Sequence, residues 1–205
     1  MAFTLSIATP AMADTATELE TAYTHLDNES YAKAFKIFEK LAKAGNAEAQ
    51  NELGLLYDAG DGVRQSDAQA LHWFTKSAEQ GYAIAQYNLA TMYEDGQGVK
   101  QDYKKAAEWY TKAAEQGDAD AQLNLGFLYD SGDGVPQSYK EAMKWYQKSA
   151  AQDNSQAMYN IGSLYYYGDG VRQNYRTAKQ WFSKACDLGH PDGCDGYDEL
   201  SNAGH

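Results

Sequence analysis

The chain has 205 residues, of which 43% are hydrophobic and 22% are charged, as is typical of a globular protein with its own core. The 17 basic and 29 acidic side chains give a net charge of −12. Since the basic side chains form no cluster, nucleic acid and anionic membrane surfaces are not expected as partners. No stretch of about 18 apolar residues occurs, so no insertion into a membrane is expected.

Residues 1–13 are interpreted as the remnant of a secretory signal peptide. The segment has no charged side chain, and Ala11-Met12-Ala13 before Asp14 fits the small-x-small pattern of a signal-peptidase site. It lacks a basic n-region, and Pro10 interrupts its apolar run. The alternative is an unstructured N-terminus, and in neither case is the segment expected to take part in the fold.

Residues 14–44 are predicted to form an N-terminal capping pair, with helices at 17–26 and 31–44. The second of these has the pattern of the second helix of the repeat described next. The first could supply its missing partner helix. A terminal pair of this kind would protect the end of a repeat array.

Residues 45–188 contain four copies of a 36-residue repeat. All four tryptophans lie at this spacing, and so do four tyrosines, four large aliphatic residues and a glycine pair followed by valine. The recurring positions are Leu53, Leu89, Leu125 and Ile161; Tyr57, Tyr93, Tyr129 and Tyr165; Trp73, Trp109, Trp145 and Trp181; and Gly60-x-Gly62-Val63 with its three later copies. Such self-similarity indicates a repeat architecture.

The third copy, residues 117–152, shows how one repeat is expected to fold. Apolar residues at mostly helical spacing predict a helix A near 119–129 and a helix B near 139–150. Between them, Gly132 and Gly134 permit the left-handed backbone of a loop. One hairpin cannot bury its own Trp and Tyr, whereas stacked hairpins can. The chain is therefore predicted to be an all-α, α/α superhelical solenoid of about ten to twelve helices.

Residues 189–205 are predicted to form a C-terminal capping helix and tail. A helix is expected over 191–200, because Pro191 falls where the earlier A helices begin and proline is tolerated at a first helical position. The Leu, Gly and Tyr signature of helix A fails there, as is typical of a terminal cap.

These repeats resemble the Sel1-like repeat (SLR) family of α/α solenoids, which is related to the tetratricopeptide repeats. The motifs that carry the resemblance in the second copy are Ala85-Gln86-Tyr87-Asn88-Leu89, Tyr93, Gly96-x-Gly98-Val99, Ala106, Trp109-Tyr110 and Ala113-Ala114-x-x-Gly117. The resemblance covers about residues 45–198. It implies an adaptor or scaffold in protein complexes rather than an enzyme, and many bacterial members of the family are exported.

The only two cysteines, Cys186 and Cys194, are predicted to form a disulfide. Superposing the repeats places Cys186 near the end of a helix B and Cys194 near the start of the next helix A, where a tight turn would bring them together. Free thiols, a metal site and a redox pair remain alternatives, although the spacing is not C-x-x-C and His190 leaves a ligand set incomplete. The spacing is also similar to that of an exported, cysteine-rich branch of the family. Together with the signal remnant, a disulfide predicts a periplasmic or secreted protein.

No catalytic arrangement, metal site or cofactor site is predicted, and the four histidines occupy unrelated phases of the repeat. An S-x-x-K motif from Ser30 to Lys33 matches that of penicillin-interacting enzymes, but S-D-N and K-T-G are absent. Ser30 is therefore interpreted as a helix N-cap. A protein that binds or hydrolyses β-lactams, or binds the cell wall, is the alternative function. Asp192, Asp195 and Asp198 are interpreted as a solvated acidic end, with a weak cation site as the alternative.

A partner-binding surface is predicted on the concave face lined by the A helices, as in tetratricopeptide-like solenoids. Exposed aromatic residues would anchor the partner, a ladder of asparagines would hold an extended peptide backbone, and acidic residues would favour a basic segment. The predicted site consists of Asn51, Leu55, Tyr87, Asn88, Glu94, Leu123, Asn124, Phe127, Asp130, Tyr159, Asn160 and Tyr166. In the alternative interpretation, the asparagines bond only within the repeat and the aromatic rings pack within the solenoid.

The sequence thus predicts a non-enzymatic, exported interaction scaffold for host interaction or cell-envelope complexes. Its partner is expected to be a protein or peptide, and a monomer is favoured.

Overall fold

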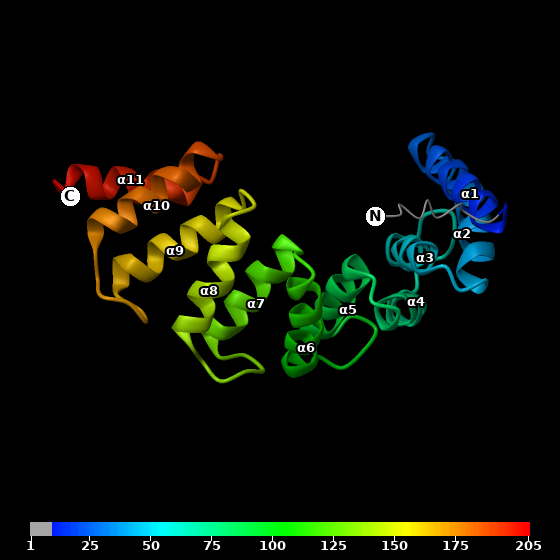
Figure 1. Ribbon diagram of the computed structural model, residues 1–205, viewed down its shortest axis with the longest axis horizontal. Coiled ribbons are helices and arrows are strands. Elements are labelled where there is room, and N and C mark those ends of the chain that lie inside the picture. Colours follow the sequence, from blue (N-terminus) through cyan, green and yellow to red (C-terminus); the bar gives the residue numbers. More distant parts are fainter. Residues whose placement is uncertain (1–9) are drawn as a thin grey trace, which may run out of the picture. The chain divides into compact units, whose positions relative to one another are not determined.

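The computed structural model describes residues 10–205, which form eleven α-helices and no strand (Figure 1). The helices are α1 (Pro10–Asp27), α2 (Tyr31–Lys43), α3 (Ala47–Ala59), α4 (Asp67–Glu79), α5 (Ala83–Asp95), α6 (Tyr103–Glu115), α7 (Ala119–Ser131), α8 (Tyr139–Ala150), α9 (Ser155–Tyr167), α10 (Tyr175–Asp187) and α11 (Pro191–Asn202). The predicted all-α fold and the predicted number of helices are confirmed.

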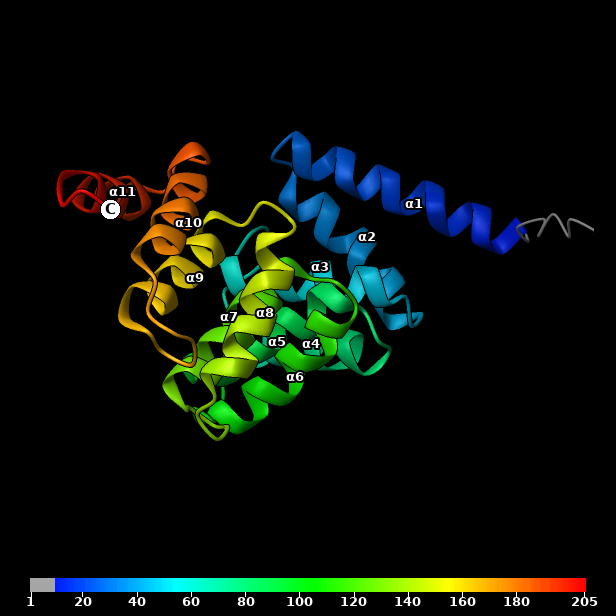
Figure 2. The same cartoon turned by 60° about the vertical axis from the view of Figure 1, so that its left-hand side comes forward.

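The chain divides into two compact units, one ending at Ala85 and the other beginning at Gln86, so the division falls within α5. In the first unit, α1 packs against α2, α2 against α3, and α3 against α4; in the second, each helix from α6 to α10 packs against the next one (Figures 1 and 2). Packing between consecutive helices is typical of a solenoid. Below, α3, α5, α7, α9 and α11 are called A helices, and α2, α4, α6, α8 and α10 are called B helices.

The predicted signal remnant, residues 1–13, lies outside the described residues except for its last four. Residues 10–13 form the start of α1, although the segment was not expected to enter the fold. Proline is tolerated at a first helical position, and alanine and methionine are strong helix formers, which accounts for the difference.

The glycine pair between helices A and B ends one helix and lets the loop lie against the preceding repeat. Gly132 follows α7 with φ 83°, and its N–H donates to the Leu128 carbonyl. Gly134 has φ 69°, and a Cβ at this residue would collide with the backbone of Tyr103 at the start of α6. Only glycine tolerates both the left-handed backbone and the close approach, which explains the recurring G-x-G signature.

A second kind of glycine brings the two helices of a hairpin close together. A Cβ on Gly126 of α7 would lie 2.6 Å from the Tyr146 ring of α8, which is fully buried. The same contact recurs between Gly54 and Phe74 and between Gly162 and Phe182. The missing side chain on the A helix thus leaves room for the buried ring of the B helix. The two helices can therefore pack closely.

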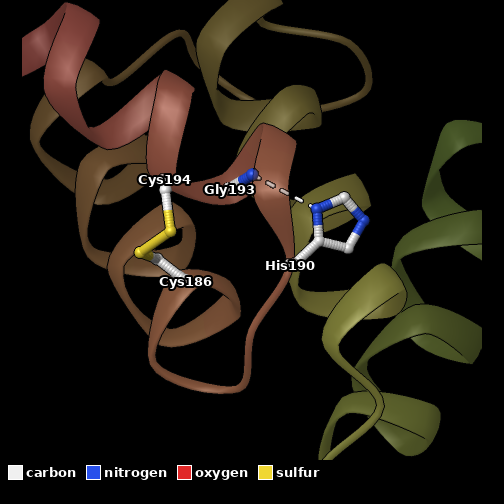
Figure 3. Close-up of a disulfide and its surroundings, with 4 residues drawn as sticks. All are labelled: Cys186, His190, Gly193 and Cys194. Atoms are coloured by element: carbon white, nitrogen blue, oxygen red, sulfur yellow. Dashed lines mark hydrogen bonds between the residues drawn. A yellow bond between two sulfur atoms is a disulfide. The ribbon is translucent and has the colours of Figure 1, made fainter.

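The predicted disulfide between Cys186 of α10 and Cys194 of α11 is confirmed (Figure 3). The two Cα atoms are 4.6 Å apart, within the range of a protein disulfide. The bond crosses the turn between the last B helix and the terminal A helix. It therefore ties α11 to the body of the second unit.

Earlier repeats join the same two positions with a hydrogen bond. Gln50 Nε2 donates to the carbonyl of Ala42 at 3.1 Å, and Gln122 Nε2 donates to the carbonyl of Ala114 at 3.0 Å. Both pairs are eight residues apart, as the two cysteines are. At the C-terminal end the chain thus replaces a hydrogen bond between helices with a covalent one.

His190 also fixes this turn, a role that the sequence analysis did not identify. It is the N-cap of α11: its Nδ1 accepts from the Gly193 N–H at 3.2 Å (Figure 3). Nε2 lies 3.0 Å from Gln156 Oε1, and because Nδ1 is an acceptor, Nε2 donates this bond. The imidazole is stacked on the Tyr159 ring, with centroids 4.9 Å apart. His190 therefore links α11 to α9.

Candidate functional site

The second unit carries ten of the twelve predicted partner-binding residues, on three A helices. They lie in rows related by the 36-residue repeat. These residues are Tyr87, Asn88 and Glu94 on α5; Leu123, Asn124, Phe127 and Asp130 on α7; and Tyr159, Asn160 and Tyr166 on α9. Phe127 is the exposed member, with 53% of its surface accessible, and the others are partly buried.

The two half-buried tyrosines at the start of the rows are packed against the next B helix. The Tyr87 ring lies 5.7 Å from the Tyr110 ring, and the Tyr159 ring lies 5.5 Å from the Phe182 ring. Packing within the solenoid, one of the alternatives above, therefore accounts for part of each ring. Each ring still keeps exposed surface, so it is held in one orientation before any partner binds.

Two of the asparagines are held by buried tyrosines of the B helices. The Tyr110 hydroxyl donates to Glu94 Oε2 at 2.5 Å and accepts from Asn124 Nδ2 at 3.0 Å. In the next repeat, the Tyr146 hydroxyl donates to Asp130 Oδ2 at 3.1 Å and accepts from Asn160. We call these two sets the carboxylate–tyrosine–asparagine triads: Glu94–Tyr110–Asn124 and Asp130–Tyr146–Asn160.

The triads place negative charge where it is partly shielded from water. Burial raises the pKa values of Glu94 and Asp130, and the hydrogen bonds from Tyr110 and Tyr146 act in the opposite direction. Because a folded-state pKa above the unfolded value means that the native carboxyl binds its proton more tightly, stability falls as pH rises through that pKa. Keeping both groups charged at neutral pH thus opposes folding. Carboxyl groups perturbed in this way concentrate at functional sites.

Replacing Tyr146 with phenylalanine tests this coupling. Tyr146→Phe removes the hydrogen bond that lowers the Asp130 pKa, so this pKa should rise further. The free energy of unfolding should fall by about 1 kcal/mol, the typical net value of one hydrogen bond. NMR titration of the Asp130 carboxyl and denaturant unfolding measure the two effects. An Asp130 pKa that is unchanged or lower would contradict the coupling.

In the first unit, one predicted site residue is wrong. Asn51 of α3 is fully buried, with 0% of its surface exposed, so it cannot contact a partner. Its Nδ2 donates to Glu52 Oε1 at 3.1 Å. Larger side chains occupy this slot in later repeats, and the short amide does not reach the surface. Leu55, one turn later, is exposed as predicted.

The S-x-x-K segment contains no activated serine. The Ser30 hydroxyl donates to the Asn28 carbonyl at 3.4 Å. Ser30 stands at the N-cap position of α2, but its side chain makes no cap hydrogen bond, so the predicted role of the side chain is wrong. Its backbone (φ −85°, ψ 50°) departs from the extended conformation of a typical N-cap such as Ser66, which turns the hydroxyl away.

Two residues that extend the rows were missed in the sequence analysis. Asp195 and Glu199 of α11 stand 36 residues after Tyr159 and Ser163, and all four line one cavity of about 240 Å³. The 36-residue period could have identified them, because α11 is itself an A helix and its residues align with those of α9. The loss of the Leu, Gly and Tyr signature concealed it, and the aspartates were interpreted as a solvated end.

Within residues 10–205, no helix has both the length and the hydrophobicity of a membrane span. The same residues contain no group of three or more His, Cys, Asp or Glu side chains arranged to hold a metal ion.

Five consecutive segments match the family model described as Sel1 repeat: residues 28–46, 47–82, 83–118, 119–154 and 155–190. Among solved structures, a Sel1 repeat protein from Oxalobacter formigenes is 32% identical, with a TM-score of 0.85, covering 91% of this chain and 76% of that one. A protective antigen of uropathogenic Escherichia coli that displays an SLR fold is 34% identical, with a TM-score of 0.83. That match covers 87% of this chain but only 39% of the E. coli chain.

Cysteine rich protein B of Helicobacter pylori is similar in fold, at 23% identity and a TM-score of 0.50, over 63% of this chain and 96% of that one. A search of curated protein sequences found no match.

Proposed function

Because the chain belongs to the Sel1 repeat family, we propose that it is a non-enzymatic scaffold that binds a protein partner through the A-helix face. The partner contributes an extended, basic segment. Repeats of this family generally serve in protein–protein interaction, and a solenoid presents one long surface assembled from equivalent helices.

The exposed Phe127 is the observation that carries the proposal. Covering this half-exposed ring with apolar surface of a partner would be favourable. Leu123 lies one helical turn before it on α7, so the two apolar side chains share one face of the helix. Buried aromatic anchors surrounded by partly polar contacts are the usual centre of a protein interface.

The triads support a basic and extended partner. Glu94 and Asp130 are held by hydrogen bonds from buried tyrosines, so their charges stand at fixed points 36 residues apart. Asn124 is oriented by hydrogen bonds to Tyr110 and Tyr87. Because a side-chain amide has two donor hydrogens and two acceptor lone pairs, it can form further bonds to a partner. Such a row suits a peptide backbone with basic side chains.

We place this activity in the periplasm or outside the cell. Disulfides persist in oxidising compartments, and Cys186 and Cys194 are joined. The E. coli relative is described as a protective antigen, which makes a role at the cell envelope or in contact with a host a reasonable extension to this chain.

Crosslinking in cells tests the function. The full chain should capture a protein partner in the cell-envelope or secreted fraction, and Phe127→Ala should weaken that binding about 30-fold, the loss of a hot-spot residue worth about 2 kcal/mol. The matched control is Leu188→Ala, which removes a similarly exposed apolar side chain (46%) from the end of α10. Equal capture by the parent and Phe127→Ala, with circular dichroism unchanged, would contradict the site. Capture only from the cytoplasm would contradict the location.

A further inference from the structure

A partly enclosed cavity of about 240 Å³ lies between α9, α10 and α11 of the second unit. Its walls have opposite chemical characters. Helices α9 and α10 contribute the aromatic rings of Tyr159, Tyr166 and Phe182, while α11 contributes the carboxylates of Asp192, Asp195 and Glu199. No lysine, arginine or histidine lines it.

Among the side chains of residues 14–205, no lysine, arginine or histidine forms an ion pair with these three carboxylates. The ion pairs found within residues 10–205 are Lys40–Glu18, Lys43–Glu39 and Lys144–Glu141, all elsewhere. The carboxylates occupy positions 192, 195 and 199, three and four residues apart, and therefore follow one face of α11. Like charges at this spacing repel one another, so a cation bound beside them would reduce that repulsion.

The aromatic wall is rigid. Tyr166 donates a hydrogen bond to Glu199 Oε1 at 2.7 Å, and its ring contacts those of Tyr175 and Phe182. The Tyr159 ring is fixed by Phe182 and by the stacked imidazole of His190. A cation that entered the cavity would therefore meet aromatic rings whose positions are already fixed, next to the carboxylates of α11.

We propose that this cavity binds the guanidinium group of an arginine side chain from the partner protein. Guanidinium is planar, stacks on aromatic rings and forms paired hydrogen bonds with carboxylates, so it matches both walls at once. A metal ion does not fit, because the carboxylates form no group that could converge on one ion. The inference rests on the proposed function, since the arginine comes from the segment that lies along the A-helix face. Asp195 and Glu199 continue the rows that contain Tyr87 and Phe127.

Titration with two short blocked peptides tests the cavity directly. The probes are N-acetyl-Gly-Arg-Gly-amide and its counterpart with citrulline, which has the same shape without the charge. NMR shifts of the full chain should centre on the amides around Tyr159 and Gly196. The citrulline peptide should bind about tenfold more weakly, equivalent to about 1.4 kcal/mol. The double variant Asp195→Asn/Glu199→Gln should weaken arginine binding by at least as much.

Asp198→Asn is the control, because it removes a carboxylate charge from the same helix at a residue that does not line the cavity. Equal binding of the two peptides, or equal loss in the control, would overturn the proposal. The crosslinking experiment keeps the two proposals distinguishable. A partner lost by Phe127→Ala but retained by Asp195→Asn/Glu199→Gln supports the scaffold and rejects the cavity. Arginine-specific shifts at Gly196 without any captured partner support the cavity and reject the scaffold.

Discussion

Gly126→Val is expected to lower the free energy of unfolding by about 3 kcal/mol, at the upper end of overpacking effects. A Cβ at this position would lie 2.6 Å from Tyr146 Cδ1, closer than two carbon atoms can approach. The ring cannot retreat, because it has no exposed surface and its hydroxyl is bonded to Asp130. Either the two helices separate or the ring leaves its position, and both changes expose core.

The sign of this effect is informative. At an unconstrained site inside a helix, replacing glycine with a better helix former stabilises by about 0.5–1 kcal/mol. Denaturant unfolding of Gly126→Val should show the opposite. The control is Glu115→Val, at the exposed last residue of α6, which should change stability by less than about 0.5 kcal/mol. A neutral or stabilising Gly126→Val would mean that the hairpin is looser than the structure indicates.

The fold could be predicted because each recurring residue has a local physical cause. A recurring glycine such as Gly134 marks a loop position with positive φ, which other residues rarely adopt. An apolar stripe at helical spacing, such as that of α8, marks the face of the helix that is buried. Repetition then multiplies a weak signal four times. The disulfide could be predicted for the same reason, because the repeat period alone places Cys186 and Cys194 at facing ends of two helices.

The site could be predicted only in part, because its chemistry depends on contacts between rows. The position of each residue along its helix predicted that Phe127 and Asn51 would both be exposed, which is correct for Phe127 and wrong for Asn51. Position alone does not take account of the length of the side chain. Tyr110 was recognised as part of the repeat motif, yet nothing in its spacing showed that its hydroxyl would bridge Glu94 and Asn124. Hydrogen bonds between side chains 14 and 16 residues apart require coordinates.

Loss of the disulfide is the second large effect expected. The variant Cys186→Ala/Cys194→Ser should lose about 2–3 kcal/mol, the chain-entropy value for a loop closed by cysteines eight residues apart. The loss should be local, because each element of a solenoid is held mainly by its neighbours and the last one has a neighbour on one side only. Hydrogen exchange should therefore accelerate in α11 first, with α7 little affected.

The earlier repeats supply the control for this variant. Cys186→Ala/Cys194→Gln reproduces the pair formed by Ala114 and Gln122, whose side-chain amide donates to the facing carbonyl at 3.0 Å. It should regain about 1 kcal/mol over Cys186→Ala/Cys194→Ser, the net value of one hydrogen bond. If neither variant altered exchange in α11, His190 and the Tyr166–Glu199 hydrogen bond would be sufficient to hold the helix. If exchange in α11 accelerated equally in both variants, a hydrogen bond at this position would be too weak to hold α11 in place. The covalent bond would then be what keeps Asp195 and Glu199 opposite the aromatic wall.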